Sequence, residues 1–389
     1  METKQKIYVF QTESVLTRGG EKYLYEILKR LNKKYKIILF LQKVSPYWKN
    51  VYKKQKIEIR LLWQPIHFYW MLLPFTLFIN WLNLKKEVKE NDVVFATNFP
   101  LSFLAILLSK KTICHCFEPL AIFYDQIVIK NHPYFSRLCI KVAKFLYSGL
   151  DKFAIKQCQI LTTLNKEVEE HIIKLYKRKP DFYLKNAVDA DFFKTNDNKK
   201  QKSKIIIGHS TDYTVFKGTE NFLEIAKLLV EKFPDLQIKI TESMIYKDVK
   251  LKYIKFVKKN KLEKNIHFIG NLSEKEMVSF YQSINAFCYT GSPLCAGGST
   301  ASLSVLEAES CGAVVFRSIG NKSEIKNGKT GFYIDPHQHK KAFDIISNYI
   351  YFSKKKKQEM SQNASKYIRE NFSWNSTSQK LENIIQLIK

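Results

Sequence analysis

Short apolar runs alternate with amphipathic helical segments along most of this 389-residue chain. The first half contains the runs KIYVF, YKIILFL, KIEIRLLW, DVVFAT, TICHCF and QILTTL, separated by helical patterns. Continuous apolar runs of this length are typical of strands buried on both faces, and strands that alternate with helices form parallel sheets. The pattern therefore predicts an α/β fold in which helices cover both sides of a parallel sheet.

The same alternation begins again after a lysine-rich polar stretch at residues 194–204, which we interpret as a linker. The second set includes the runs IIIG, LQIKIT, IHFIG, AFCYT, VVFRS and GFYID. Because a chain of this length exceeds one ordinary hydrophobic core, two domains are expected. We place them at 1–195 and 196–365. A last helix near 355–389 is also expected, with residues 366–389 packing back on the first domain.

Lysine gives the chain a formal net charge of +28. Such a charge is compatible with nucleic-acid binding, but the sequence has no recognised nucleic-acid motif and no basic tail. We therefore favour attraction to an anionic membrane surface or to a phosphorylated substrate over nucleic acid.

The seven cysteines include no Cys-x-x-Cys pair, and most lie in apolar runs. This distribution favours buried free thiols in a reducing compartment over metal or disulfide use. The N-terminal run KIYVF has the length of a strand and no cleavage site. We expect a cytoplasmic protein without a signal peptide, with membrane association left open.

Residues 61–84 contain no Lys, Arg, Asp or Glu. Their number suits a membrane span, but the two prolines and several polar residues within the segment argue against one. Tryptophan and tyrosine in it are favoured where apolar chain meets lipid headgroups. Three interpretations stay open: an interfacial or acceptor-binding hairpin, ordinary packing between domains, and a span.

Two helix starts have the features of a phosphate-binding site. Gly19 and Gly20 open the first predicted helix, where the absence of Cβ atoms lets a ligand approach the backbone. Ser299, Thr300, Ala301 and Ser302 begin a helix that runs to about Ser310, and their N–H groups suit a diphosphate. Glu307 lies about two turns further on, near the same face. Its carboxylate can accept hydrogen bonds from ribose hydroxyls, although a solvated surface glutamate is equally compatible with this spacing.

Lys217 and Gly218 precede another predicted helix, after a strand that ends at Gly208. A lysine at that edge of a sheet is a common partner of phosphate, although a surface lysine is the simpler interpretation in so basic a chain.

The order of the segments KNAVDADFF, KGTENFLEIAKLL, FIGNLSEKEMVSFYQ, VLEAESCGAVVF and EIKNGKTGFYI resembles the retaining glycosyltransferases of family 4. LEAESCGAVVF is similar to that family's Leu-Glu-Ala-Met-Ala-x-Gly-x-Pro-Val-Val segment, and NGKTGFYI to its Asp-Gly-x-Thr-Gly segment. The resemblance implies a GT-B fold, in which two Rossmann-like domains face each other across a cleft that holds a nucleotide-sugar donor. It also implies that the amides near Ser302 meet the diphosphate and that Glu307 meets the ribose.

The resemblance further implies the site residues. Lys217, Glu307 and His115 would be the catalytic group. The donor-binding group would be Gly19, Gly20, His209, Asn271, Leu272, Ser299, Thr300, Ala301 and Ser302. The family mechanism needs no metal and no cofactor beyond the nucleotide-diphosphate sugar, which is a co-substrate.

Three departures from the family pattern concern the site. Ser299 stands where the first of two family glutamates is expected, and Phe117 stands where a histidine precedes Glu-Pro. His115, two residues earlier on the predicted strand, points to the same side. The family's arginine upstream of the lysine is not evident, and His209 or the neighbouring Ser210 lies in that region.

We therefore expect a retaining glycosyltransferase that acts on a glycan, lipid-linked or other acceptor. Two alternatives stay open. A non-catalytic GT-B protein would bind a nucleotide or a glycan without turnover, and a basic protein would associate with membranes or nucleic acid through charge alone.

Overall fold

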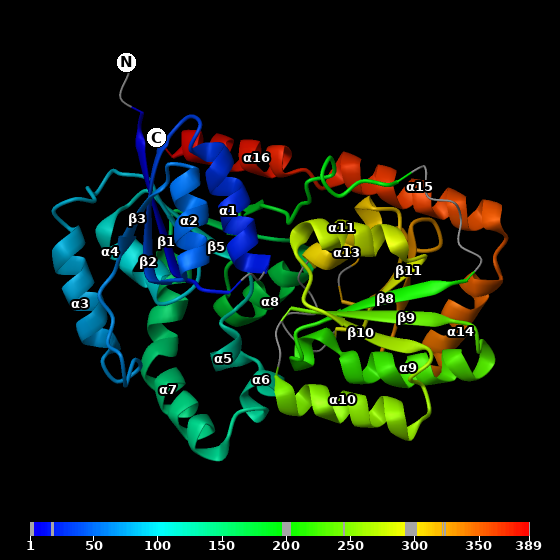
Figure 1. The fold of residues 1–389 in the computed structure, drawn as a ribbon. Coiled ribbons are helices and arrows are strands. Elements are labelled where there is room, and N and C mark those ends of the chain that lie inside the picture. Colours follow the sequence, from blue (N-terminus) through cyan, green and yellow to red (C-terminus); the bar gives the residue numbers. More distant parts are fainter. Residues whose placement is uncertain are drawn as a thin grey trace. The chain divides into compact units, whose positions relative to one another are not determined.

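The structure, a computed structural model, describes residues 4–16, 19–196, 204–243, 246–291, 302–320, 322 and 324–388. The chain divides into two compact units: Met1–Asn186 with Trp374–Lys389, and Ala187–Ser373. The sequence placed the boundaries nearer residues 195 and 365. Each unit is a parallel sheet covered by helices (Figure 1), which confirms the predicted α/β class.

Within the described residues, the sheet of the first unit has seven strands in the order β3-β2-β1-β4-β5-β6-β7. The strands are β1 (Lys6–Ser14), β2 (Lys36–Val44), β3 (Glu58–Leu61), β4 (Val94–Ala96), β5 (Thr112–Cys116), β6 (Ile160–Thr163) and β7 (Phe182–Tyr183). The helices are α1 (Gly19–Leu31), α2 (Pro46–Lys54), α3 (Leu73–Leu84), α4 (Leu101–Leu108), α5 (Ala121–Tyr124), α6 (Gln126–Lys130), α7 (Tyr134–Gln157), α8 (Lys166–Tyr176) and α16 (Trp374–Leu387).

Side chains of the first sheet alternate between two helical layers, as the pleat of a strand requires. Tyr8 and Phe10 of β1 pack into a cluster with residues of α3, α4 and α7. On the opposite face Tyr23 of α1 stacks on His115 of β5 with 5.0 Å between the ring centres. Tyr23 also contacts Trp374 of α16 at 5.6 Å, so α1 and α16 lie together on that face.

Within the described residues, the sheet of the second unit has six strands in the order β10-β9-β8-β11-β12-β13. The strands are β8 (Ile206–Thr211), β9 (Gln237–Glu242), β10 (Ile266–Gly270), β11 (Ala286–Tyr289), β12 (Val314–Ser318) and β13 (Gly331–Ile334). The helices are η1 (Val215–Lys217), α9 (Thr219–Lys232), α10 (Lys247–Lys259), α11 (Glu274–Ser283), α13 (Leu303–Ser310), α14 (His339–Tyr351) and α15 (Lys354–Asn371).

The C-terminal region is two helices, not the single helix that the sequence predicted near 355–389. Between α15 and α16 the chain is extended, because the N–H of Val188 donates to the carbonyl of Phe372 at 3.1 Å and Val188 also pairs with Ser373. Beyond this break α16 belongs to the first unit. Lys34 holds it there through an ion pair with Glu382, at 2.7 Å.

The uncharged segment 61–84 forms the end of β3, a connecting stretch and α3. Asn80 of α3 connects this helix to the stretch that follows β3. Its side chain accepts the N–H of Trp63 at 2.9 Å and donates to the carbonyl of Trp63 at 2.8 Å. Leu73 is buried, whereas Ile66 and Phe75 are 93% and 62% exposed. Across the part of the chain that the structure describes, no helix combines the length and the apolar character needed to cross a bilayer.

The cysteines whose positions are described are free thiols, as the sequence predicted. Most are buried in the two units, and Cys139 on α7 is exposed.

Candidate functional site

In each sheet the strand order reverses at one point. The reversal falls between β8 and β11 in the second unit and between β1 and β4 in the first. Ligands of open parallel sheets bind outside the carboxyl ends of the strands at such a point. The loops that follow these strands are therefore the expected ligand-binding loops.

The loops after β8 and β11 approach each other so closely that glycine is required twice. Gly218 has a φ of 62°, and a Cβ there would lie 1.9 Å from the carbonyl oxygen of Thr290. A Cβ on Gly291 would lie 2.5 Å from the carbonyl oxygen of Phe216. Thr290 Oγ1 also donates to the Gly218 carbonyl at 2.8 Å. These contacts hold the two loops together, and we call residues 216–218 with residues 290–291 the switch-point rim. The close contacts leave no room for a larger residue at either glycine.

Lys217 lies on this rim, at the end of η1 and directly before Gly218. Its side chain is half-buried, and its Nζ lies 5.6 Å from the ring centre of Tyr289, the last residue of β11. An ammonium group at this distance is attracted to the face of an aromatic ring. The rim therefore carries a positioned cation at the switch point, where lysine can act as a point charge for an anionic ligand.

A second cation lies against the same tyrosine ring. The guanidinium carbon of Arg317, in β12, is 4.5 Å from the ring centre of Tyr289. Arg317 is fully buried, and its Nε donates to Oε2 of Glu324 at 2.5 Å while its Nη1 donates to Oγ of Ser318 at 2.8 Å. A buried charge persists only when it is paired and hydrogen-bonded, so these contacts retain Arg317 inside the unit.

Glu324 links this ion pair to the start of α13. Its Oε1 accepts the backbone N–H of Ser302, the residue that caps the helix. A carboxylate is stabilised at a helix N-terminus by the N–H group and by the helix dipole. The sequence analysis expected the Ser302 amide to meet a diphosphate, and the structure instead shows it bonded to Glu324. Ser299, Thr300 and Ala301 lie outside the described residues.

A second carboxyl group lies inside α13, at Glu309. Burial raises the pKa of Glu309 well above its ordinary value, and the charge of Glu324 raises it further. Burial therefore favours the protonated form of Glu309, whereas Glu324 forms the ion pair with Arg317.

Glu307, the predicted ribose partner, is buried rather than solvated. Its side chain is 8% exposed, and the hydroxyl of Tyr281 in α11 donates to its Oε2 at 3.2 Å. These contacts exclude the interpretation of Glu307 as a surface residue. Its role toward a ribose stays a prediction.

His209, predicted as a donor contact, is enclosed by the second unit. Its Nδ1 is 2.9 Å from the carbonyl oxygen of Cys288, and its Nε2 is 3.0 Å from Oγ1 of Thr219. Burial lowers the pKa of His209 to about 4, so the ring is neutral at neutral pH. Both ring nitrogens are engaged within the fold, where His209 joins β8, β11 and α9. Its role toward a donor stays a prediction.

Asn271 and Leu272 follow β10, the edge strand that β9 separates from β8. Leu272 packs against the apolar cluster that includes Val305 and Leu306 of α13, and Asn271 is exposed. Of this predicted pair, only Leu272 is thus associated with the helix that carries Glu307.

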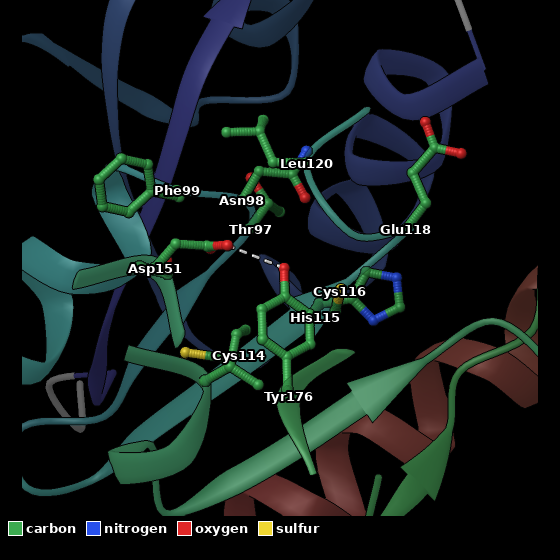
Figure 2. Close-up of a pocket in the computed structure, with 12 residues that line it drawn as sticks. Thr97, Asn98, Phe99, Cys114, His115, Cys116, Glu118, Leu120, Asp151 and Tyr176 are labelled. Carbon is green, nitrogen blue, oxygen red and sulfur yellow. Dashed lines mark hydrogen bonds between the residues drawn. The ribbon is translucent and has the colours of Figure 1, made fainter. Parts of the chain in front are cut away.

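A small cavity lies at the carboxyl ends of β4 and β5 in the first unit (Figure 2). It holds about 10 Å³, which is room for a single water-sized group. Three buried polar atoms of its lining have no hydrogen-bond partner among the described residues: Ser102 Oγ, His115 Nε2 and Glu118 Oε2. Such atoms are rare in folded proteins, so the cavity is suited to a hydroxyl group or a water molecule.

His115 is fixed in this lining by contacts on every side. Its Nδ1 is 2.9 Å from Oγ1 of Thr162, and burial lowers its pKa to about 3, which leaves the ring neutral. Phe117, which stands where the family pattern has histidine, packs edge-on against His115 with 4.5 Å between the ring centres. Because Nδ1 is engaged, Nε2 is the ring atom left to meet a ligand.

Glu118 is a residue of this cavity that the sequence analysis did not select. Burial raises its pKa to about 7, and the charge of Asp125 contributes. Asp151, on the other side of the cavity, has its pKa raised to about 6 by burial. The hydroxyls of Tyr124 and Tyr176 donate to Asp151 at 2.8 Å and 3.0 Å, and Figure 2 shows the bond from Tyr176. The signals for Glu118 in the sequence were its place between two apolar runs and the Glu-Pro pair of the family pattern.

Glu118→Gln is expected to change how stability depends on pH. Folded Glu118 binds its proton up to about pH 7, whereas an unfolded glutamate releases it near 4.5. The folded state therefore binds more protons in this window, and stability falls as the pH rises through it. Glutamine does not titrate, so we expect the variant to lose this part of the slope and to gain up to about 3 kcal/mol at neutral pH.

Urea unfolding of the full chain at several pH values measures this effect. Glu170→Gln, an exposed glutamate on α8, is the matched control and should leave the slope unchanged. Identical slopes for Glu118→Gln and the wild type would contradict the prediction.

Gly19 and Gly20 are the first residues of α1, as predicted. Among the described residues, a Cβ on Gly20 would have no atom within 4 Å. Thr17 and Arg18, just before them, lie outside the described residues.

Asp189 and Asp191 form an Asp-x-Asp pair, a pattern that can bind a metal. Asp189 instead accepts the N–H groups of Asp191 and Phe192, both at 3.2 Å, and Asp191 pairs with Arg369 at 2.9 Å. Among the residues with described positions, no group of three His, Cys, Asp or Glu side chains is arranged to hold a metal ion.

Comparison with known proteins places this architecture in a class. Residues 189–367 match the family model of glycosyl transferases group 1, so the second unit carries a domain of this kind. Among curated proteins, none matches the chain significantly in sequence.

Solved structures match the whole chain. A glycosyltransferase from Rickettsia africae has a TM-score of 0.76 at 17% identity, with 99% of this chain and 98% of that chain covered. HepE of Anabaena in complex with UDP has a TM-score of 0.75 at 14% identity, with 98% and 99% covered. Sucrose-phosphate synthase of Thermosynechococcus elongatus has a TM-score of 0.76 at 11% identity, with 99% of each chain covered. The fold is therefore the two-domain Rossmann-like fold of GT-B glycosyltransferases.

Proposed function

We propose that this protein is a glycosyltransferase that binds a nucleotide-diphosphate sugar at the switch-point rim of its second unit. The observation that carries the proposal is Lys217, a positioned cation beside the rim formed by Gly218 and Gly291. It lies within the segment that matches glycosyl transferases group 1. A lysine there would stabilise the negative charge that develops on the leaving diphosphate.

In the same proposal, Glu307 binds the ribose of the donor. Its carboxylate lies on α13, and Tyr281 already donates one hydrogen bond to it. A carboxylate is an acceptor of hydrogen bonds, which is the chemistry that ribose hydroxyl groups need from a partner. The sequence resemblance supports transfer with retention of configuration and without a metal.

We assign the acceptor to the first unit. The lining of the cavity includes His115, Glu118 and Ser102, each with a buried polar atom that has no hydrogen-bond partner among the described residues. Glycan and lipid-linked acceptors both carry hydroxyls. The basic charge and the exposed apolar side chains of residues 61–84 support association of this unit with an anionic membrane, and thus favour a lipid-linked acceptor.

A second candidate function is nucleotide or glycan binding without turnover. It is favoured by the bond between Glu324 and the Ser302 amide, because that amide is not available to a diphosphate in this conformation. Donor binding without release of the sugar, with or without acceptor, would distinguish this function from transfer.

Calorimetry and thermal unfolding of the full chain with nucleotide sugars test the proposal. Structures of HepE contain UDP and UDP-glucose, so UDP-sugars are the first donors to use. A donor present at about 100 times its dissociation constant should add roughly 2.7 kcal/mol to the stability of the folded state. If no nucleotide sugar or nucleoside diphosphate binds the folded protein, the proposed function is wrong.

A further inference from the structure

The outward face of α7 carries a stripe of large apolar side chains that the protein leaves uncovered. The exposed residues are Tyr134, Phe135, Leu138, Val142, Phe145, Leu146 and Phe153. Phe145, near the middle of the helix, is 85% exposed. Scattered exposed hydrophobic residues are normal, but a contiguous row of this kind marks an interaction site.

Helix geometry shows that these residues form one face. Leu138, Val142, Phe145 and Phe153 follow the spacing of one side of a helix, at about 100° per residue. Ile140, Ala143 and Tyr147, about half a turn away, are buried against the rest of the unit. The helix is therefore apolar on both its inner and its outer sides, a pattern that soluble surface helices lack.

Other helices of the same layer also carry exposed apolar side chains. Residues of α3, α4 and α7 share the apolar cluster on one side of the sheet, and Figure 1 shows these helices on that side. Phe153 of α7 meets Phe103 of α4, with ring centres 6.4 Å apart. On α3 and the stretch before it, Ile66, Phe75 and Phe78 are exposed.

Basic residues lie beside the apolar stripe on α7, and the acidic residue of this helix is buried. The helix contains Arg137, Lys141, Lys144, Lys152 and Lys156, which all lie on its exposed or half-buried sides. Its acidic residue, Asp151, is 2% exposed and bonded to two tyrosines. Outward, α7 is therefore an apolar stripe edged by positive charge only.

We propose that the outer face of α7, together with α3, is a docking surface for an anionic lipid bilayer. Apolar side chains enter the headgroup boundary while flanking lysines meet anionic lipids, as in helices that lie in the interface plane. A second copy of this chain fits less well, because self-association would bring two sets of cations together. The inference rests on the membrane association proposed above for residues 61–84 and assigns its main contact to α7.

Co-sedimentation of the full chain with vesicles tests this surface. Phosphatidylcholine vesicles with and without phosphatidylglycerol separate the charge contribution from the apolar one. Two α7 variants are used: Val142→Ser with Phe145→Ser, and Lys141→Glu with Lys152→Glu. The matched controls lie on α10 of the second unit: exposed Leu251→Ser, and Lys258→Glu with Lys259→Glu.

We expect the wild type to bind anionic vesicles and to be released by high salt. Lys141→Glu with Lys152→Glu should bind at least about tenfold more weakly, since each lysine near an anionic surface contributes roughly fivefold. Val142→Ser with Phe145→Ser should also bind at least about tenfold more weakly, since two apolar side chains no longer enter the headgroup boundary. The α10 variants should bind like the wild type. Equal binding by wild type and both α7 variants would overturn the proposal.

Light scattering without lipid tests the competing interpretation, in which a second copy of this chain covers the outer face of α7. If the wild type is a dimer and Val142→Ser with Phe145→Ser makes it a monomer that still binds vesicles, the face is a dimer interface and the proposal is wrong. Donor binding, measured by calorimetry on the same α7 variants, separates the two proposals. In the α7 variants, intact donor binding beside weakened vesicle binding is the expected result. A wild type that binds donor but no vesicles overturns only the docking surface, and a wild type that binds no donor overturns the proposed function.

Discussion

Arg317→Ala is expected to lower the free energy of unfolding of the second unit by about 3–5 kcal/mol. The reason is the carboxylate that it leaves behind. Glu324 is fully buried, and its charge-assisted bond from Arg317 Nε would be lost. Glu309 cannot compensate, since it is a second buried carboxyl group whose pKa is already raised by burial and by Glu324.

Two further measurements identify the mechanism of this loss. In Arg317→Ala, Glu324 can regain neutrality by binding a proton, so the defect should diminish as the pH falls. The double variant Arg317→Met with Glu324→Gln should recover most of the stability, because both charges are removed and glutamine still accepts the Ser302 N–H. Hydrogen exchange of β12 and α13 reports on this unit directly. A single Arg317→Ala variant within about 1 kcal/mol of the wild type, or a double variant as weak as the single one, would contradict the ion-pair account.

Lys217→Ala and Glu307→Gln should each weaken catalysis by about 10- to 150-fold, but in different ways. Lys217 would meet charge that grows as the glycosidic bond breaks, so its loss should mainly lower kcat. Glu307 would meet a ribose that does not react, so its loss should mainly raise KM for the donor. Glutamine is preferred to alanine at position 307 because it can still accept the hydrogen bond from Tyr281.

Controls separate these roles from effects on folding. Tyr281→Phe removes the bond to Glu307 but keeps the carboxylate, so it should raise KM far less than Glu307→Gln. Lys258→Ala removes an exposed lysine of α10 and should leave both kinetic constants unchanged. Kinetics with the donor identified by calorimetry provide the measurement. Equal donor affinity and kcat in the wild type, Lys217→Ala and Glu307→Gln would show that the site is placed wrongly.

The strands of both sheets were predictable because a buried parallel strand leaves a local signature. Runs such as IIIG and VVFRS correspond to β8 and β12, and each lies between helical segments. The helix 355–389 was predicted less well. Its sequence is compatible with one continuous helix, and the break after Asn371 follows from pairing of Phe372 and Ser373 with Val188, far away in the chain.

The site was predictable to the extent that it depends on loops next to strand ends. Lys217 and Gly218 were found because a lysine and a glycine follow a recognisable strand and precede a helix. For His209, the sequence does not show that the ring turns inward to Cys288 and Thr219. Arg317 and Glu324 were missed, although an arginine inside the apolar run VVFRS was a signal that a buried partner must exist.

The sequence by itself determined the two parallel-sheet units, their strands and the glycine-rich positions where backbone is open, since these depend on periodicity and on residues close in the chain. Only the tertiary structure decided which side of each helix is covered. On α7 the inner and the outer faces are both apolar, so no local pattern tells which one packs against the sheet. Only the tertiary structure likewise decided the ion pair of Arg317 and Glu324 and the cavity lined by His115 and Glu118. Each joins side chains that acquire their burial, and hence their charge state, only when separate elements come together.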